Sequence, residues 1–273
     1  MIYHLFQYLE KLGVDFPGIG LMHYLSFRAM LAAVTAVLTS LIAGKRIIRW
    51  LQKKQIGETV RDLGLEGQVQ KKGTPTMGGI IIILSIITGV ILFCDLTNIY
   101  IILLIVSTLW CGALGFADDY IKVFRHNKEG MSEKGKLLGQ VVLGFIVGLA
   151  VWMSPDIVVR EKVHVEESIE RTLETETTVT SGKYVDEDVV KSTKTTIPFV
   201  KNHEFDYRWL SPVKGAWGWY AKWAIYVLMI IIVITACSNG TNLTDGLDGL
   251  AAGTSAVVGV VLILESNHFR FLS

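Results

Sequence analysis

The sequence is poor in charged residues. Asp, Glu, Lys and Arg make up only 19% of its 273 residues, whereas hydrophobic residues make up 51%. Soluble domains usually contain about 25% charged residues. The apolar residues are gathered into runs of about 17 to 20, the helix length that crosses a hydrocarbon layer about 30 Å thick. An ordinary soluble domain is therefore excluded, and we expect an integral membrane protein.

Cysteine is scarce as well. Cys94, Cys111 and Cys237 lie in or beside apolar runs, and their spacing matches no metal motif. We interpret them as small apolar side chains rather than as redox or metal-binding groups. The first twenty residues lack the basic start and short apolar core of a cleavable signal peptide. The net charge of +1 gives no reason to expect a nucleic-acid partner.

Six apolar segments are long enough to cross a membrane. They run from about Tyr24 to Ala43, Gly78 to Phe93, Ile99 to Ala117, Lys136 to Met153, Trp219 to Cys237 and Leu247 to Leu264. Lipid admits only helices and closed barrels, and these segments are too long and too uniform for barrel strands. The predicted fold is therefore an all-α integral membrane protein with about six transmembrane helices.

Lysine and arginine are distributed unevenly among the connecting loops. They are frequent between Lys45 and Lys72 and between Lys122 and Lys134, but the short link Cys94–Asn98 has none. Because basic short loops face the cytoplasm, the loops after the first, third and fifth helices are predicted to be cytoplasmic. The N-terminus is then on the opposite side.

One long polar stretch, Ser154–Gly218, interrupts the helices. Its alternation of apolar and polar residues predicts β-strands around a turn at Ser181-Gly182. The orientation places this β-rich insertion outside the cytoplasm, and it divides the chain into residues 1–153, 154–218 and 219–273. Tryptophans near its end are expected to anchor the return to the membrane, namely Trp209, Trp217, Trp219 and Trp223.

The first cytoplasmic patch is "QKKGTPTMGGI", Gln70–Ile80. Lys71 and Lys72 precede a turn with Pro75, and Gly78-Gly79 opens the second helix. The N-terminus of a helix presents unpaired N–H groups and a positive dipole end, so it attracts phosphate, and a lysine adds a point charge. A basic loop with a proline turn explains the same residues, and both interpretations stay open.

The second patch lies around Asp118 and Asp119, which end an apolar helix. A carboxylate at a membrane boundary is costly, so such residues are functional candidates. Two adjacent carboxylates repel each other unless a cation neutralises them, and oxygen ligands favour Mg²⁺. A salt-bridge cluster at the membrane surface is the alternative.

Lysines accompany this acidic pair. Lys122 is four residues after Asp118 and shares its helical face. Lys134 and Lys136 begin the next helix, with Ser132 as its predicted N-cap.

The third patch is the segment Ser238–Gly253, predicted to be a glycine-rich turn that opens the sixth helix. Its polar residues are Asn239, Asn242, Asp245 and Asp248. Helix caps in an Asn/Asp-rich turn would explain one or two of these, but not four. Since all three patches lie on one predicted membrane face, they suggest a Mg²⁺-dependent diphosphate site at the lipid boundary, where charge neutralisation and positioning supply most of the catalysis.

Four motifs in order, "KKGTPTMGG", "ADDYIKV", "NKEGMSEKGKLLGQ" and "NLTDGLDGLA", closely resemble those of the phospho-N-acetylmuramoyl-pentapeptide transferase family. This family belongs to the polyprenyl-phosphate N-acetylhexosamine-1-phosphate transferase superfamily, and the resemblance runs from about Leu25 to Gly253. It implies transfer of phospho-N-acetylmuramoyl-pentapeptide from UDP-N-acetylmuramoyl-pentapeptide to undecaprenyl phosphate. UMP is released, and the product is the first lipid-linked peptidoglycan precursor. A multi-pass place in the bacterial inner membrane, a requirement for Mg²⁺ and a lipid bilayer as partner are implied too.

The resemblance also implies roles for individual residues. Asp118 would be the base or the nucleophile, and Asp119 would organise the metal or the diphosphate. Asp118, Asp119 and Asn239 would hold Mg²⁺. The substrate-binding residues would be Lys72, Thr76, Lys122, Lys134, Asn242, Asp245 and Asp248.

The chain also departs from the family pattern. The family has more spanning helices, a later "MGDxGS"-type loop and a histidine-rich cytoplasmic loop, and none of these is in the sequence. We therefore expect a C-terminally truncated form with little or no activity on its own. Three alternatives stay open: a sibling N-acetylglucosamine-1-phosphate transferase, a transporter or channel using intramembrane carboxylates, and a non-catalytic membrane remnant. Homodimerisation is left open.

Overall fold

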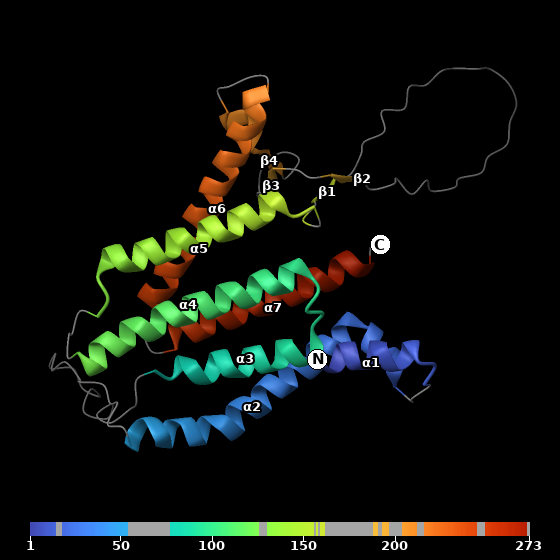
Figure 1. Ribbon diagram of the computed structural model, residues 1–273, viewed down its shortest axis with the longest axis vertical. Coiled ribbons are helices and arrows are strands. Elements are labelled where there is room, and N and C mark those ends of the chain that lie inside the picture. Colours follow the sequence, from blue (N-terminus) through green and yellow to red (C-terminus); the bar gives the residue numbers. More distant parts are fainter. Residues whose placement is uncertain are drawn as a thin grey trace, which may run out of the picture. The chain divides into compact units, whose positions relative to one another are not determined.

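The computed structural model describes residues 1–14, 18–53, 77–125, 130–155, 157, 159–161, 188–190, 193–196, 204–211, 216–244 and 249–271. The described part is mostly helical (Figure 1). It forms two compact units: Met1–Val147 with Ile230–Ser273, and Gly148–Met229. The predicted division at residues 153 and 218 stays a prediction.

Within the described residues, each predicted apolar segment coincides largely with a helix. The helices are α1 Ile2–Lys11, η1 Ile19–His23, α2 Leu25–Lys53, α3 Gly79–Phe93, α4 Ile99–Phe124, α5 Glu133–Met153, α6 Ala216–Thr244 and α7 Leu250–Phe271. Among the described residues, four helices, α2, α4, α5 and α6, are long and apolar enough to cross a membrane, whereas α3 and the apolar part of α7, Leu250–Leu262, are shorter.

Several boundaries differ from those predicted. Helix α2 ends ten residues later than Ala43, and α4 ends seven residues later than Ala117. The extensions carry Lys, Arg and Gln, which are good helix formers although they are polar. Hydropathy therefore finds the apolar centre of each helix but not its ends. Helix α1 and the short η1 were not predicted at all.

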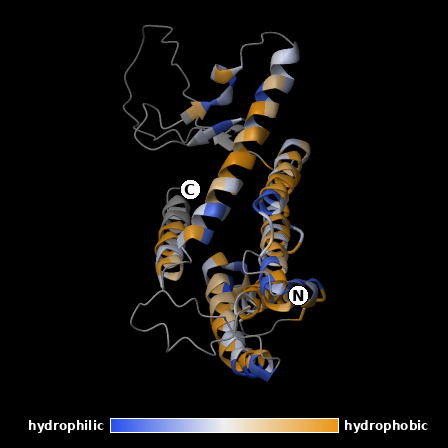
Figure 2. Ribbon diagram, turned by 90° about the vertical axis from the view of Figure 1, so that its left-hand side faces the viewer, coloured by the Kyte–Doolittle hydropathy of each residue, from blue (hydrophilic) through white to orange (hydrophobic). Residues whose placement is uncertain are grey.

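The helices turn much of their apolar surface outward. Met30, Val34, Val37 and Leu41 on α2 are all exposed, and Figure 2 shows the helices coloured largely hydrophobic. A soluble monomer rarely exposes apolar patches of this extent. Since lipid would cover such a surface, the pattern is that of a membrane protein.

Small residues allow the helices to approach one another. A Cβ atom on Gly89 of α3 would lie 2.6 Å from the carbonyl oxygen of Ala32 on α2. A Cβ atom on Gly144 of α5 would lie 2.8 Å from the Cα of Ile231 on α6. Close backbone packing through small residues is typical of helices in membranes, where dispersion forces replace the hydrophobic effect.

An apolar cluster joins three helices at one end. Leu51 near the end of α2 and Met77 before α3 are buried, and Ile47, Ile80 and Val123 pack against them. The end of α2, the start of α3 and the end of α4 therefore meet at one place. Asp118 and Asp119 lie within the last two turns of α4, at this same end.

The second unit contains the described strands. Strand β1 Val159–Glu161 pairs antiparallel with β2 Asp188–Val190, and β3 Lys194–Thr196 pairs antiparallel with β4 Glu204–Asp206. These short ladders support strands in this stretch. The predicted turn at Ser181-Gly182 lies outside the described residues, so a β-rich insertion stays a prediction.

The tryptophans of this unit divide into two groups. Trp209, Trp217 and Trp219 are exposed, as expected of membrane anchors. Trp223 is only 4% exposed and packs edge-on against Tyr226. The prediction of an anchoring role for Trp223 was therefore wrong, because this ring faces the aromatic interior of its unit.

Candidate functional site

The Asp118 carboxylate is held from three directions. Lys122 Nζ lies 2.7 Å from Oδ2, and Lys136 Nζ lies 3.0 Å from Oδ1. The backbone N–H of Met131 donates to Oδ1 at 2.8 Å. Asp118 is only 14% exposed at its side chain. The negative charge is thus neutralised by two ammonium groups, one from its own helix and one from α5.

The predicted pairing on α4 is confirmed. Asp118 and Lys122 are four residues apart and therefore lie on one face of the helix. Ser132 also has its predicted capping role, since its Oγ accepts a hydrogen bond from Gly135 N at 3.3 Å. This cap starts α5 where Lys136, in its first turns, reaches Asp118.

Gly130 is a site residue that sequence reasoning missed. It is buried, and its φ of 74° lies in the left-handed region that favours glycine. A Cβ here would collide with the Asp118 carboxylate and lie 2.7 Å from Lys122 Cε. Glycine therefore allows the chain to turn over the carboxylate and bring Met131 N into contact. The sequence feature that could have indicated Gly130 is its position after a charged run and before the N-cap of α5, where a glycine is typical of a turn.

A groove of about 640 Å³ opens beside this cluster, between α4, α5 and α6. Its apolar lining residues include Cys111, Leu114, Leu143, Ile234 and Cys237. Its polar lining residues include Asp118, Lys136, Gln140, Ser238, Thr241 and Asn242. A cavity with an apolar lining and a few converging polar groups is the usual form of a ligand site. This one suits a molecule with a charged part and an apolar part.

Gln140 is a second residue that sequence reasoning did not single out. It is 6% exposed, and its Nε2 donates to Ser238 Oγ at 3.0 Å and to Asn239 Oδ1 at 3.1 Å. Asn239 Nδ2 donates back to Gln140 Oε1 at 3.1 Å. This reciprocal amide pair fixes α5 to α6 beside the groove. The sequence signal was a lone glutamine within an apolar run.

The predicted third patch needs a correction. Helix α6 continues through Thr244, so Asn239 and Asn242 lie on its last turns and not in an open turn. The segment Ser238–Thr244 contains no proline that would end the helix. Asn242 lines the groove, and Asn239 bonds Gln140.

The other predicted site residues take different places. Asp119 is half-buried beside Asp118 on α4, and it does not line the groove. Lys134 is exposed at the start of α5 and does not line the groove either, whereas Lys136 does. Lys72, Thr76, Asp245 and Asp248 lie outside the described residues.

The donors at Asp118 and Asp119 suit Mg²⁺ in kind, because this ion prefers carboxylate oxygens. Within the described part of the chain, no group of three His, Cys, Asp or Glu side chains is placed to hold a metal ion. Both Asp118 oxygens contact ammonium groups, and the Asn239 amide bonds Gln140. A metal at Asp118 would therefore have to displace a lysine from the carboxylate.

Two family models match this sequence. The model for glycosyl transferase family 4 matches residues 190–270. A signature of phospho-N-acetylmuramoyl-pentapeptide-transferase matches residues 71–83, a range that includes the first motif.

Curated relatives resemble the chain along nearly all its length. The phospho-N-acetylmuramoyl-pentapeptide-transferase of Parabacteroides distasonis is 54% identical over 100% of the chain, and that of Porphyromonas gingivalis 51% identical over 100%. The enzyme of the same name in Flavobacterium psychrophilum is 50% identical over 98%. The chain spans 63%, 63% and 64% of these relatives' own lengths. By the signature and by this whole-chain likeness, the chain is similar to the phospho-N-acetylmuramoyl-pentapeptide-transferases over somewhat less than two thirds of their length.

Proposed function

We propose that this chain supplies the Asp118 site of an enzyme that transfers phospho-N-acetylmuramoyl-pentapeptide from its UDP-linked donor to undecaprenyl phosphate. The products are UMP and the first lipid-linked peptidoglycan precursor. The observation that carries the proposal is the groove, which joins Asp118 and Lys136 to an apolar lining. A polyprenyl phosphate has the same two-part chemistry. The relatives' name supports the choice of donor.

The lysines explain how Asp118 could change its role when substrate binds. A diphosphate carries more negative charge than one carboxylate, so it competes for Lys122 and Lys136. An Asp118 oxygen released in this way accepts a proton from the lipid phosphate. The lipid phosphate oxygen then attacks the sugar-bearing phosphorus, and the bond between that phosphorus and the UMP oxygen breaks. UMP leaves with the electron pair of this bond.

The proposal includes Mg²⁺, held by Asp118, Asp119 and Asn239. When bound, the ion would neutralise diphosphate charge. Lys72, Thr76, Lys134, Asp245 and Asp248 complete the proposed substrate contacts. Magnesium dependence is checked by titrating Mg²⁺ against UMP release after chelation.

The proposed setting is the bacterial inner membrane, crossed six times, with Asp118 at the cytoplasmic face and the insertion 154–218 outside. It is supported by the four helices suited to spanning and by the cluster at Leu51 and Met77, where three helix ends meet. The shorter α3 and α7 would be the remaining two spans.

Release of UMP in nanodiscs tests the proposal. The full-length protein containing this sequence is supplied with UDP-N-acetylmuramoyl-pentapeptide and undecaprenyl phosphate. Asp118→Asn should lower the rate at least about 100-fold, the size of a lost acid–base group. The control Asp95→Asn, in the loop between α3 and α4, should retain the rate. Equal rates for Asp118→Asn and the unaltered protein would overturn the proposal. Faster turnover of UDP-N-acetylglucosamine would assign the sibling activity instead.

A further inference from the structure

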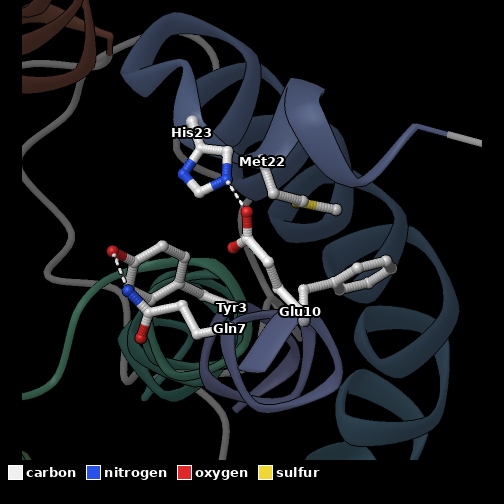
Figure 3. A pocket seen from close by; sticks show the side chains of 6 residues that line it. Tyr3, Gln7, Glu10, Met22 and His23 are labelled. Atoms are coloured by element: carbon white, nitrogen blue, oxygen red, sulfur yellow. Dashed lines mark hydrogen bonds and ion pairs between the residues drawn. The ribbon is translucent and has the colours of Figure 1, made fainter. Parts of the chain in front are cut away.

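The face of helix α1 that lies against η1 combines polar and apolar side chains, Tyr3, Phe6, Gln7 and Glu10, around a small cavity. Tyr3, Gln7 and Glu10 lie on one face, and Gln7 Nε2 donates to the Tyr3 hydroxyl at 2.7 Å. Glu10 Oε1 lies 3.1 Å from Nε2 of His23 in η1 (Figure 3). The cavity among these side chains is about 10 Å³, the space of a single water molecule, so it is not a ligand site.

The opposite face of α1 is apolar and exposed. Leu5, Tyr8 and Leu12 follow the spacing i, i+3, i+7 and are 55%, 60% and 59% exposed. A helix on the surface of a soluble protein usually carries charged and polar residues on its outward face instead. The surroundings of α1 must therefore be more apolar than water on the side away from the protein.

Several contacts fix α1 at one end of the first unit, among them hydrogen bonds from the Met1 ammonium to the carbonyl oxygens of Ile91 and Leu92 on α3. The backbone N–H of Leu96, between α3 and α4, donates to His4 Nε2 at 3.2 Å. The Arg28 guanidinium, in the first turn of α2, lies 4.2 Å from the centre of the Tyr3 ring. Figure 1 shows α1 beside the start of α2 and the end of α3.

This end lies opposite the Asp118 site. Helix α4 begins after Asn98, beside the loop that contacts His4, and reaches Asp118 about 30 Å further along its axis. That rise equals the thickness of the hydrocarbon core of a bilayer, about 30 Å. If Asp118 lies at one membrane face, α1 lies at the other.

We infer that α1 is a membrane-surface helix that inserts Leu5, Tyr8 and Leu12 among lipids at the face opposite Asp118. Its ten residues span about 15 Å, too short to cross the membrane. Leu21, Tyr24 and the apolar outer surface of α2 are exposed as well, and lipid would cover them too. Tyrosine is enriched at such boundaries. The inference rests on the proposed membrane topology and not on transferase activity.

Spin labels on single cysteines test the inference. The full-length protein in nanodiscs, with its native cysteines replaced by alanine, carries one label at position 5, 12 or 11. Labels replacing Leu5 and Leu12 should collide severalfold more with oxygen, which concentrates in lipid, than with a water-soluble nickel chelate. Lys11 lies at the edge of the stripe and is the matched control, whose label should favour nickel.

Labels replacing Val34 and Val37 on α2 report the topology separately. If these two positions favour oxygen while positions 5 and 12 favour nickel as Lys11 does, the inference is wrong and the topology stands. Shielding of positions 5 and 12 from both reagents would also overturn it, since a second protein copy would then cover the stripe. A nickel preference at Val34 and Val37 would contradict the topology itself. None of these readouts depends on UMP release.

Discussion

The two ends of α2, α3 and α4 both gather polar side chains, but they differ in what surrounds them. At the Asp118 end, a carboxylate and two ammonium groups border a groove of about 640 Å³. At the α1 end, the polar groups Tyr3, Gln7, Glu10 and His23 pair among themselves around about 10 Å³. A cluster of polar side chains at a membrane boundary therefore does not by itself indicate a ligand-binding site. A site also needs space into which the charges face.

The largest expected effect comes from the lysine that borders the groove. Lys136→Met removes one of the two ammonium groups on Asp118 and should lower UMP release about 100-fold, comparable to losing one preorganised donor. Lys134→Met removes a proposed substrate contact that is exposed and does not line the groove, so its loss should be the smaller of the two. Rates of both variants in nanodiscs make the comparison. Equal losses would mean that contact with Asp118 does not distinguish the two lysines.

The next effect concerns the turn over Asp118. Gly130→Ala forces a Cβ into the left-handed region and against the carboxylate, which together should destabilise the fold by roughly 2 to 4 kcal/mol. Gly253→Ala on α7, where a Cβ meets nothing within 4 Å, should be neutral or slightly stabilising. Thermal unfolding in detergent measures both. An unchanged melting temperature for Gly130→Ala would show that the turn does not depend on glycine.

A smaller effect compares one glutamine at each end. Gln140→Leu leaves Ser238 and Asn239 without a buried partner and should cost about 1 to 3 kcal/mol. Gln7→Leu removes one hydrogen bond, to Tyr3, and should cost about 0.5 to 1.5 kcal/mol. The melting temperatures of the two variants measure these losses of stability. A greater decrease for Gln7→Leu than for Gln140→Leu would show that the hydrogen bonds of Gln140 are not the more stabilising ones.

Sequence reasoning located most of the helices and part of the site. Asp118 with Lys122 followed from helical spacing, and the Ser132 cap from its residue type. The lysine of α5 that contacts Asp118 could not be predicted. Lys134 and Lys136 are about 200° apart around α5, and only the packing of α5 on α4 determines which of them faces Asp118. Hydropathy stopped α6 at Cys237, although the helix continues through Asn239 and Asn242. Helix α1 was missed because its apolar stripe is interrupted by polar residues and is far shorter than a span.

The groove can be tested directly through its own cysteines. Cys111 and Cys237 line it, and Cys94, at the opposite end of the helices, does not. The account predicts that undecaprenyl phosphate with UDP-N-acetylmuramoyl-pentapeptide slows alkylation of Cys111 and Cys237 by an apolar maleimide and leaves Cys94 unchanged, as measured by mass spectrometry of nanodisc samples. If the substrates left the alkylation rates of Cys111 and Cys237 unchanged, as they should leave that of Cys94, the assignment of the groove as the site of transfer would be contradicted.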